Sequence, residues 1–351
     1  MKNNFLVIMA GGIGSRFWPM STEKLPKQFH DILGIGKTLL QLTLERFEKI
    51  CPIENIFIIT NEQYFDITKS QLPMLNDNQI IGEAFRRNTA PCIAYAAHKI
   101  NKINKNANMI VAPSDHIILN QTYFEEVIHS GINCAENQNA LVTIGIEPSR
   151  PDTGYGYIEY ELKENCKYNK VIQFKEKPNR AKALEYMSKG NFVWNSGMFI
   201  WKNSTILNEF SIHLPNIHQL FTSATKYYNT AEEKTHLLNI YEKCSDISID
   251  YGIMEKATNV ITIPSQLQWS DLGTWRSLYD QLEKSDNGNT IKGNKIIISD
   301  SENNLIHLSG NKKCIIHGLN EYIVVDQNDM LLICKMEDEQ KIKSLVSKLS
   351  S

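Results

Sequence analysis

A glycine-rich segment close to the N-terminus has the residue types of a phosphate-binding loop. Gly11, Gly12 and Gly14 lie just after a short apolar run that we expect to be a buried strand. Because glycine has no Cβ, main-chain N–H groups in such a loop can approach an anion closely. Arg16 and Lys27 add two positive charges within the same part of the chain. This combination favours a binding site for a nucleoside triphosphate.

Two familiar nucleotide motifs do not account for this loop. The Gly-Lys-Thr at 36–38 is not a P-loop, because Asp31 stands where that motif needs a glycine. Thr38 is instead expected to cap a helix that begins at Leu39. The opening loop also lacks the G-x-G-x-x-G pattern and its acidic partner. We therefore expect a different kind of triphosphate loop, the alternative being a tight turn with surface cations.

Two aspartates further along the chain are candidate metal ligands. Asp115 lies in the segment 112–116, which directly follows an apolar strand, and a carboxylate at the end of a strand is suited to bind Mg²⁺. Its alternative role is to cap the next turn. Asp271 lies in the segment 269–275, where a helix N-cap is an equally good interpretation. His116 is expected to pack or to form hydrogen bonds, because Mg²⁺ prefers oxygen ligands.

A third group of polar residues could recognise a sugar phosphate. Glu176 and Asn195 could form hydrogen bonds with sugar hydroxyls, and Lys177 could hold a phosphate as a point charge. The alternative is that these residues belong to a charged loop and a buried strand. The residue types alone leave both interpretations open.

Composition limits the class of protein. The chain has 351 residues, 42% of them hydrophobic and 22% charged, as in ordinary globular proteins. The net charge of −2 argues against a nucleic-acid-binding protein. None of the seven cysteines forms a C-x-x-C pair, so we expect reduced thiols and a cytoplasmic location. No signal peptide and no apolar run long enough to span a membrane is evident.

The apolar pattern predicts an α/β protein. Short apolar runs at 57–60, 109–112 and 141–146 alternate with helical spacing, which is typical of right-handed βαβ units and a parallel sheet. Ligands of such sheets bind beyond the carboxyl ends of the strands, where the glycine loop is expected. Short β-like runs recur after a polar, linker-like stretch at 284–290. We therefore expect a first domain at 1–285 and a small β-rich, solenoid-like domain at 286–351 that ends in a helix.

Taken together, these segments resemble the sugar-nucleotidyltransferase family, and within it the mannose-1-phosphate guanylyltransferases. One difference is that Ala84-Phe85-Arg86 replaces the usual Pro-x-Gly. The resemblance is to the short form, since the chain has no room for the phosphomannose isomerase domain of longer relatives. It implies a Rossmann-like, mixed but mainly parallel nucleotidyltransferase domain of the GT-A type and a β-helix-like C-terminal domain. The matching segments follow in order: 10–19, 26–29, 87–91, 112–116, 153–158, 174–178, 195–201, 249–257 and 269–275.

The resemblance also implies a reaction and roles for individual residues. GTP and α-D-mannose 1-phosphate would give GDP-mannose and diphosphate by in-line, Mg²⁺-assisted attack on the α-phosphorus, for polysaccharide biosynthesis. The residues implied are Arg16, Lys27 and Lys177 for catalysis; Ala10, Gly11, Gly12, Gly14, Ser15, Arg87, Asn88 and Ser114 for the nucleotide; Gly156, Glu176, Lys177 and Asn195 for the sugar phosphate; and Asp115 and Asp271 for Mg²⁺.

Two other functions are kept beside this one. The first is a guanylyltransferase for another sugar 1-phosphate, because the sequence does not show the shape of the pocket. The second is a catalytically silent regulatory subunit that binds a sugar nucleotide. The presence of Arg16, Lys27, Asp115, Lys177 and Asp271 together speaks against the silent subunit. A homodimer is kept as a candidate oligomeric state, and no nucleic-acid or membrane partner is expected.

Overall fold

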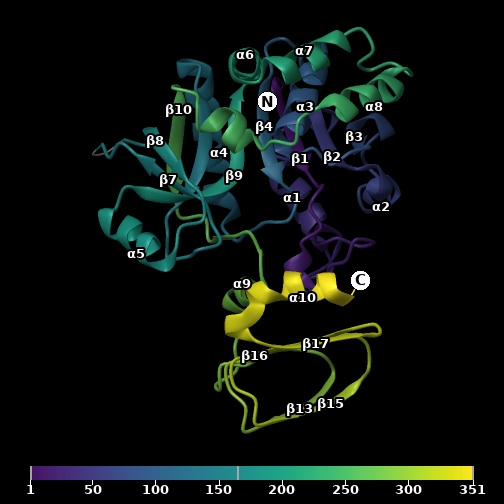
Figure 1. Cartoon of the computed structure of the whole chain (residues 1–351), viewed down its shortest axis with the longest axis vertical. Coiled ribbons are helices and arrows are strands. Elements are labelled where there is room, and N and C mark those ends of the chain that lie inside the picture. The colour runs from purple at the N-terminus through teal and green to yellow at the C-terminus, as the bar shows by residue number, and fades with distance from the viewer. Residues whose placement is uncertain (1, 164–165, 350–351) are drawn as a thin grey trace. The chain divides into compact units, whose positions relative to one another are not determined.

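The computed structural model describes residues 2–163 and 166–349 (Figure 1). The chain forms two compact units, and it crosses between them several times. The first unit consists of Met1–Gly11, Thr43–Ser114 and Ile118–Trp269. The second consists of Gly12–Leu42, Asp115–Ile117 and Ser270–Ser351. The predicted boundary between 285 and 286 divides the sequence at a different point, and it stays a prediction.

A nine-stranded mixed sheet forms the first unit, in the order β3-β2-β1-β4-β9-β6-β10-β8-β7. Strands β1 to β4 pair in parallel, as do β6 and β10, whereas β9 is antiparallel to both of its neighbours β4 and β6. The predicted α/β architecture with a mixed sheet is thereby confirmed. The strands are β1 (Asn4–Met9), β2 (Ile56–Asn61), β3 (Ile80–Glu83), β4 (Asn108–Pro113), β6 (Leu141–Ile146), β7 (Tyr157–Tyr160), β8 (Asn169–Lys175), β9 (Phe192–Lys202) and β10 (Val260–Ser265).

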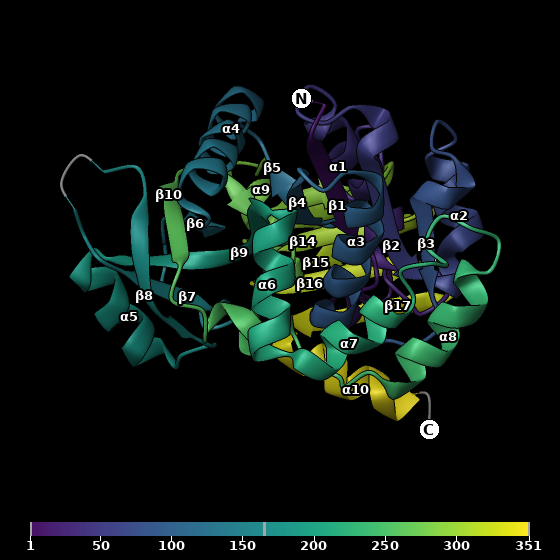
Figure 2. The same cartoon turned by 90° about the horizontal axis from the view of Figure 1, so that it is seen from above.

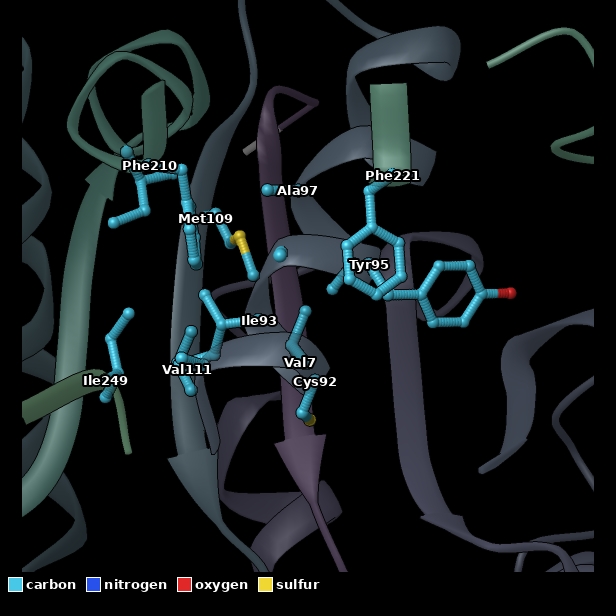
Figure 3. Close-up of a cluster of buried hydrophobic side chains, with 14 of the residues drawn as sticks. Val7, Cys92, Ile93, Tyr95, Ala97, Met109, Val111, Phe210, Phe221 and Ile249 are labelled. Carbon is cyan, nitrogen blue, oxygen red and sulfur yellow. The ribbon is translucent and has the colours of Figure 1, made fainter. Parts of the chain in front are cut away.

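Helices cover this sheet and bury its apolar side chains. Figure 3 shows Val7, Met109 and Val111 of the sheet beside Ile93 of α3 and Phe210 of α6, and all five side chains are buried. Helices α3 and α6 also pack against each other (Figure 2). The helices are α1 (Leu39–Phe47), which continues from the second unit, α2 (Phe65–Gln71), α3 (Thr89–Ile103), α4 (Gln121–Gln138), α5 (Arg180–Lys189), α6 (Asn203–His213), α7 (Pro215–Ser223) and α8 (Glu233–Lys243).

The second unit combines the glycine loop with a C-terminal β-solenoid. Strands β12, β14 and β16 pair in parallel and β17 closes this sheet in antiparallel fashion, while β13 and β15 form a second parallel pair. Ile306, Ile316 and Val324 belong to one apolar cluster of this solenoid. The strands are β12 (Thr290–Lys292), β13 (Lys295–Ser299), β14 (Leu305–Leu308), β15 (Lys313–His317), β16 (Tyr322–Gln327) and β17 (Met330–Lys335).

Short helices complete the second unit. The 3-10 helices η1 (Ser15–Phe17) and η2 (Lys27–Phe29) lie in the loop segment. In the sequence, α9 (Trp275–Gln281) precedes the solenoid strands, and η7 (Met336–Lys341) and α10 (Ile342–Leu349) follow them. Helix α10 packs against η1. The short strands β5 (Ile117–Ile118) and β11 (Trp269–Ser270) pair with each other.

Buried asparagines connect successive turns of the solenoid. Asn289 Oδ1 accepts hydrogen bonds from the main-chain N–H and the side chain of Asn304, both at 3.0 Å. Asn304 Nδ2 in turn donates to Leu319 O at 2.9 Å. The polar stretch 284–290, expected as a linker, therefore ends inside the solenoid, where Asn289 and Thr290 are both buried. Side-chain amides replace main-chain hydrogen bonds at these turns.

Candidate functional site

The glycine loop is attached to the following segment through its carbonyl groups. Gln28 Nε2 donates to Gly12 O at 3.1 Å, and the Ser21 hydroxyl donates to Ile13 O. A trans peptide directs its N–H opposite to its C=O. The N–H groups of Ile13 and Gly14, which follow these two carbonyls, therefore point away from the Ser21 and Gln28 side chains.

Gly14 is the position of the loop that requires glycine. Its φ of +67° lies in the left-handed region, and a Cβ there would lie 2.9 Å from Lys27 Cβ. At Gly12, in contrast, an added Cβ would meet no atom within 4 Å. The close approach of Gly14 to Lys27 thus fixes how the loop lies on η2.

The two sides of η1 have opposite environments. Arg16 is exposed, whereas the next residue, Phe17, is completely buried. Phe17 packs in an apolar cluster that also contains Trp275 and Ile342. An exposed cation is therefore carried on a turn whose neighbouring side chain is anchored in the core of the second unit.

Lys27 connects three segments of the second unit. Its side chain is 3% exposed, and its ammonium group forms an ion pair with Asp115 Oδ2 at 2.9 Å. It also donates to the carbonyl oxygens of Asp271 at 2.7 Å and Leu272 at 2.9 Å. A lysine ammonium group has three N–H donors, so these three acceptors can use all of them. Lys27 thus brings together the two aspartates that the sequence suggested as metal ligands.

The charge state of Asp115 is set by Lys27. Burial of the Asp115 carboxyl would raise its pKa, but the positive charges of Lys27 and then His116, together with the hydrogen bond from Lys27, outweigh burial and hold the pKa below its usual value. His116 Nε2 lies 3.8 Å from Asp115 Oδ1. Asp115 is therefore ionised at neutral pH, as an oxygen ligand for a cation must be.

Asp115 and Asp271 are the residues near Lys27 that could hold a divalent metal ion together with substrate. The described ranges 2–163 and 166–349 contain no cluster of three or more His, Cys, Asp or Glu side chains that could hold a metal by itself. Mg²⁺ is commonly bound by one or two carboxylates together with phosphate oxygens and water. Asp115 and Asp271 could supply the two carboxylates, although Lys27 contacts Asp271 through its main-chain carbonyl and not through its side chain. The Asp271 Oδ1 atom also accepts a hydrogen bond from Gly273 N at 2.8 Å.

In the first unit, the residues predicted to contact the sugar lie together. Asn195 N donates to Gly156 O at 2.8 Å, and a Cβ on Gly156 would lie 3.0 Å from Glu176 Oε2. Lys177 and Glu176 form an ion pair, with both side chains about half exposed. The structure thus groups Gly156, Glu176, Lys177 and Asn195, which come from β9 and the segments next to β7 and β8.

Asp250 is a member of this group that sequence reasoning missed. Asn195 Nδ2 donates to Asp250 Oδ1 at 2.7 Å. Burial raises the pKa of Asp250, the hydrogen bond from Asn195 opposes this, and the nearby charge of Glu176 raises it further. Asp250 begins the π-helix η6 (Asp250–Met254). Its only signal in the sequence was its place inside the matching segment 249–257.

The remaining predicted nucleotide residues of the first unit have structural contacts. Ala10 N donates to Ile59 O at 2.7 Å, and Ser114 N donates to Met9 O at 3.1 Å. The Asn88 side chain accepts from Thr89 N at the start of α3. Gly11 follows Ala10, and Ser15 begins η1 in the second unit.

Arg87 is held by main-chain carbonyl groups at the C-terminal end of α8. Its Nε atom donates to Tyr241 O at 3.1 Å and its terminal nitrogen to Glu242 O at 3.2 Å. The guanidinium lies over the ring of Phe85, 5.7 Å from its centre. Phe85 is the central residue of Ala84-Phe85-Arg86, the segment that replaces the expected Pro-x-Gly.

The fold and these two groups of residues define a nucleotidyl transferase, and the chain belongs to that family: its model matches residues 6–288. The chain is 37% identical to mannose-1-phosphate guanylyltransferase 2 of Escherichia coli O157:H7, over 98% of this chain and 73% of that protein. It is 35% identical to the alginate biosynthesis protein AlgA of Pseudomonas aeruginosa, over 98% of this chain and 72% of that protein. The predicted resemblance is thereby confirmed.

A solved structure agrees with these sequence comparisons. The Thermus thermophilus protein described as mannose-1-phosphate geranyltransferase has a TM-score of 0.87 and 28% identity, over 99% of this chain and 100% of that chain. Nucleotidyl transferases of this kind generally use a divalent metal ion. Among the described residues, no helix is long and apolar enough to cross a membrane. All seven cysteines are free thiols.

Proposed function

We propose that this protein transfers GMP from GTP to α-D-mannose 1-phosphate, giving GDP-mannose and diphosphate. The observation that carries the proposal is the junction at Lys27, which links the glycine loop to Asp115 and Asp271. Loop amides with an exposed arginine suit the phosphates of a nucleoside triphosphate, and paired carboxylates suit its metal ion. The Escherichia coli O157:H7 relative acts on mannose 1-phosphate according to its name, which supports this sugar phosphate as the second substrate.

The nucleophile of this reaction needs no general base. A phosphate monoester with a second pKa of about 6 is largely dianionic at pH 7. The barrier comes from bringing two anions together and from the charge that develops on the leaving diphosphate. Positioning and electrostatic stabilisation must therefore supply most of the catalysis.

The second unit would bind the triphosphate. Arg16 and the N–H groups of the glycine loop would bind the phosphates that leave, since both are donors directed at developing negative charge. Lys27 would act by holding Asp115 and the Asp271 main chain in place. When bound there, Mg²⁺ would neutralise phosphate charge and orient the reacting groups. Ser15, at the start of η1, would add a hydroxyl donor.

The first unit would bind mannose 1-phosphate. Glu176 and Asp250 are acceptors for sugar hydroxyls, and Asn195 can both donate and accept. Lys177 would hold the sugar phosphate as a point charge. Gly156 leaves room beside Glu176, where a side chain would be only 3.0 Å from the carboxylate. Arg87 and Asn88 are proposed to contribute to the nucleotide site.

Diphosphate release with a matrix of substrates tests this function. The purified chain is incubated with Mg²⁺, each of the four nucleoside triphosphates, and several sugar 1-phosphates. The expected result is highest kcat/KM for GTP with mannose 1-phosphate. A preference for another sugar would identify a guanylyltransferase of different specificity. Failure of every pair, with sugar nucleotide still bound in a calorimetric titration, would favour the silent subunit.

The proposed reaction also suggests a cellular setting. GDP-mannose is an activated sugar, so an enzyme that forms it would supply mannosyl transfer in polysaccharide biosynthesis. The seven free thiols are typical of a reducing compartment such as the cytoplasm. Lysis of cells under denaturing conditions in a thiol-alkylating maleimide, followed by counting of the alkylated cysteines by mass spectrometry, would test that compartment, with all seven cysteines alkylated as the expected result.

A further inference from the structure

The side chain that positions Arg16 comes from a distant part of the sequence. Arg16 itself is exposed, so the position of its backbone depends on the two residues that follow it. Phe17 is completely buried, and its ring lies 4.7 Å from the ring of Trp275, centre to centre. The side chain of Trp275 also reaches the next residue, because its indole N–H donates to Trp18 O at 3.1 Å. The ring contact with Phe17 and the hydrogen bond to Trp18 O are thus both made by Trp275.

Trp275 is itself firmly held. It is completely buried and is the first residue of α9, which Thr274 and Ser277 begin with reciprocal side-chain hydrogen bonds to the main chain. The next residue, Arg276, donates its main-chain N–H to Glu339 Oε2 at 2.8 Å. A side chain that is fixed by packing and hydrogen bonds in this way can hold a neighbouring loop in one position.

The same tryptophan is close in sequence to the second candidate metal ligand. Asp271 lies four residues before Trp275, and Lys27 binds the carbonyls of Asp271 and Leu272. Lys27 Nζ also lies 5.6 Å from the centre of the Phe17 ring. Arg16, which would bind phosphate, is therefore next to a residue in contact with Trp275, and Asp271, which would bind metal, is close to Trp275 in sequence.

We propose that Trp275 is a positioning residue, which sets Arg16 for transition-state binding through its contacts with Phe17 and Trp18. This inference rests on the proposed function, in which Arg16 binds the leaving phosphates. Small displacements of a catalytic group are costly, since an error of about 1 Å can reduce a rate 10²-fold. Loss of the indole hydrogen bond should therefore lower turnover more than it lowers stability.

The test compares Trp275→Phe with a matched variant elsewhere in the protein. Trp275→Phe keeps an aromatic ring beside Phe17 but removes the N–H that binds Trp18 O. Trp201→Phe makes the same chemical change at another fully buried tryptophan, whose indole N–H has no hydrogen-bond partner within the described part of the chain. We expect both variants to lose a similar few degrees in Tm. Only Trp275→Phe should lose kcat, by roughly 10-fold, with the KM for mannose 1-phosphate unchanged.

A double-mutant cycle with Arg16→Ala identifies the route of the effect. If Trp275 acts through Arg16, Trp275→Phe should change kcat less than about 2-fold in the Arg16→Ala background, because the interaction is already lost. An undiminished effect there would overturn the proposal, as would wild-type kcat in Trp275→Phe. A wild-type protein that is inactive with every substrate pair would instead remove the proposed function, and this inference with it.

Discussion

Lys27 illustrates how a residue that looks catalytic in sequence can act through others. The sequence predicted that Lys27 lies close to the glycine loop, and in the structure Lys27 does pack against Gly14. What the sequence does not contain is the set of three acceptors, from Asp115, Asp271 and Leu272, that meet at its buried ammonium group. These acceptors are remote in the chain, so only the folded structure shows that Lys27 joins them.

Replacing Lys27 should destabilise the protein. Lys27→Met would leave Asp115 and two carbonyl groups without their shared donor, and breaking a buried ion pair costs about 3 kcal/mol. Urea unfolding monitored by tryptophan fluorescence gives the free energy of unfolding directly. Lys24→Met at an exposed site nearby is the control and should change it by less than about 0.5 kcal/mol. Equal effects of the two variants would contradict the role of Lys27.

The ion pair also predicts a dependence on pH. The folded-state pKa of Asp115 lies below the ordinary value of 3.8, so the stabilisation is complete above that value and is lost as the pH falls through the folded-state pKa. Lys27→Met should lack this part of the acid dependence. Urea midpoints measured between pH 5 and pH 2.5 provide the comparison, and parallel curves for wild type and variant would count against the pair.

Gly14 offers a second test at the scale of single residues. Gly14→Ala would need φ of +67° and would bring its Cβ to 2.9 Å from Lys27 Cβ, so we expect a loss of about 1–3 kcal/mol in the free energy of unfolding. Gly12→Ala, where a Cβ meets no atom within 4 Å, should be nearly neutral in the same unfolding experiment. Comparable losses at both positions would show that the left-handed conformation of Gly14 is not decisive.

At the scale of elements, α10 shows how the C-terminal region supports the glycine loop. The helix packs against η1, and its Ile342 is 1% exposed in the same cluster as Phe17. Its last turn is different, since Leu349 is 72% exposed. The apolar spacing near 338–349 predicted a helix here, but it carried no information about which element that helix would cover.

The two ends of α10 should therefore respond differently to truncation of a side chain. Ile342→Ala should cost about 2–4 kcal/mol, the usual range for removing a buried isoleucine side chain beyond Cβ. Leu349→Ala should cost less than about 0.5 kcal/mol, because the side chain is in solvent. Differential scanning calorimetry of both variants measures the contrast. An insensitive Ile342→Ala would mean that α10 does not support the cluster around Phe17.

Other elements show where a local pattern is sufficient and where it fails. The strand before the glycine loop was predictable because its apolar run is uninterrupted. Strand β14 was missed, since it has only four residues and contains His307. Asp250 was missed as a site residue because its chemistry depends on Asn195, which is far away in sequence. Periodicity reports local burial, whereas these features arise from tertiary contacts.

At the scale of the whole molecule, each unit contains a buried histidine that should make the protein sensitive to acid. Burial, with the neighbouring His218, lowers the pKa of His98 to about 4; burial, with Lys292 nearby, lowers the pKa of His307 to about 4. The ordinary value is 6.5, so between pH 6.5 and 4 the unfolded chain binds more protons than the folded one. The free energy of unfolding must therefore fall as the pH falls through this window.

The predicted size of this effect is on the order of 1–2 kcal/mol for each histidine between pH 7 and pH 5. Urea unfolding at the two pH values measures it, and His98→Gln or His307→Gln should each remove its own share. His129→Gln, at an exposed position, is the control and should leave the difference between the two pH values intact. Stability independent of pH in the wild type would contradict the burial of neutral imidazoles.

The central claim concerns which bond of GTP is broken, and labelled GTP tests it most directly. The protein is incubated with Mg²⁺, mannose 1-phosphate and GTP carrying ³²P at either the α or the γ position. Attack on the α-phosphorus predicts that the α label appears in GDP-mannose and the γ label in diphosphate, and that neither forms without mannose 1-phosphate. Recovery of the γ label as inorganic phosphate or on the sugar would contradict the account.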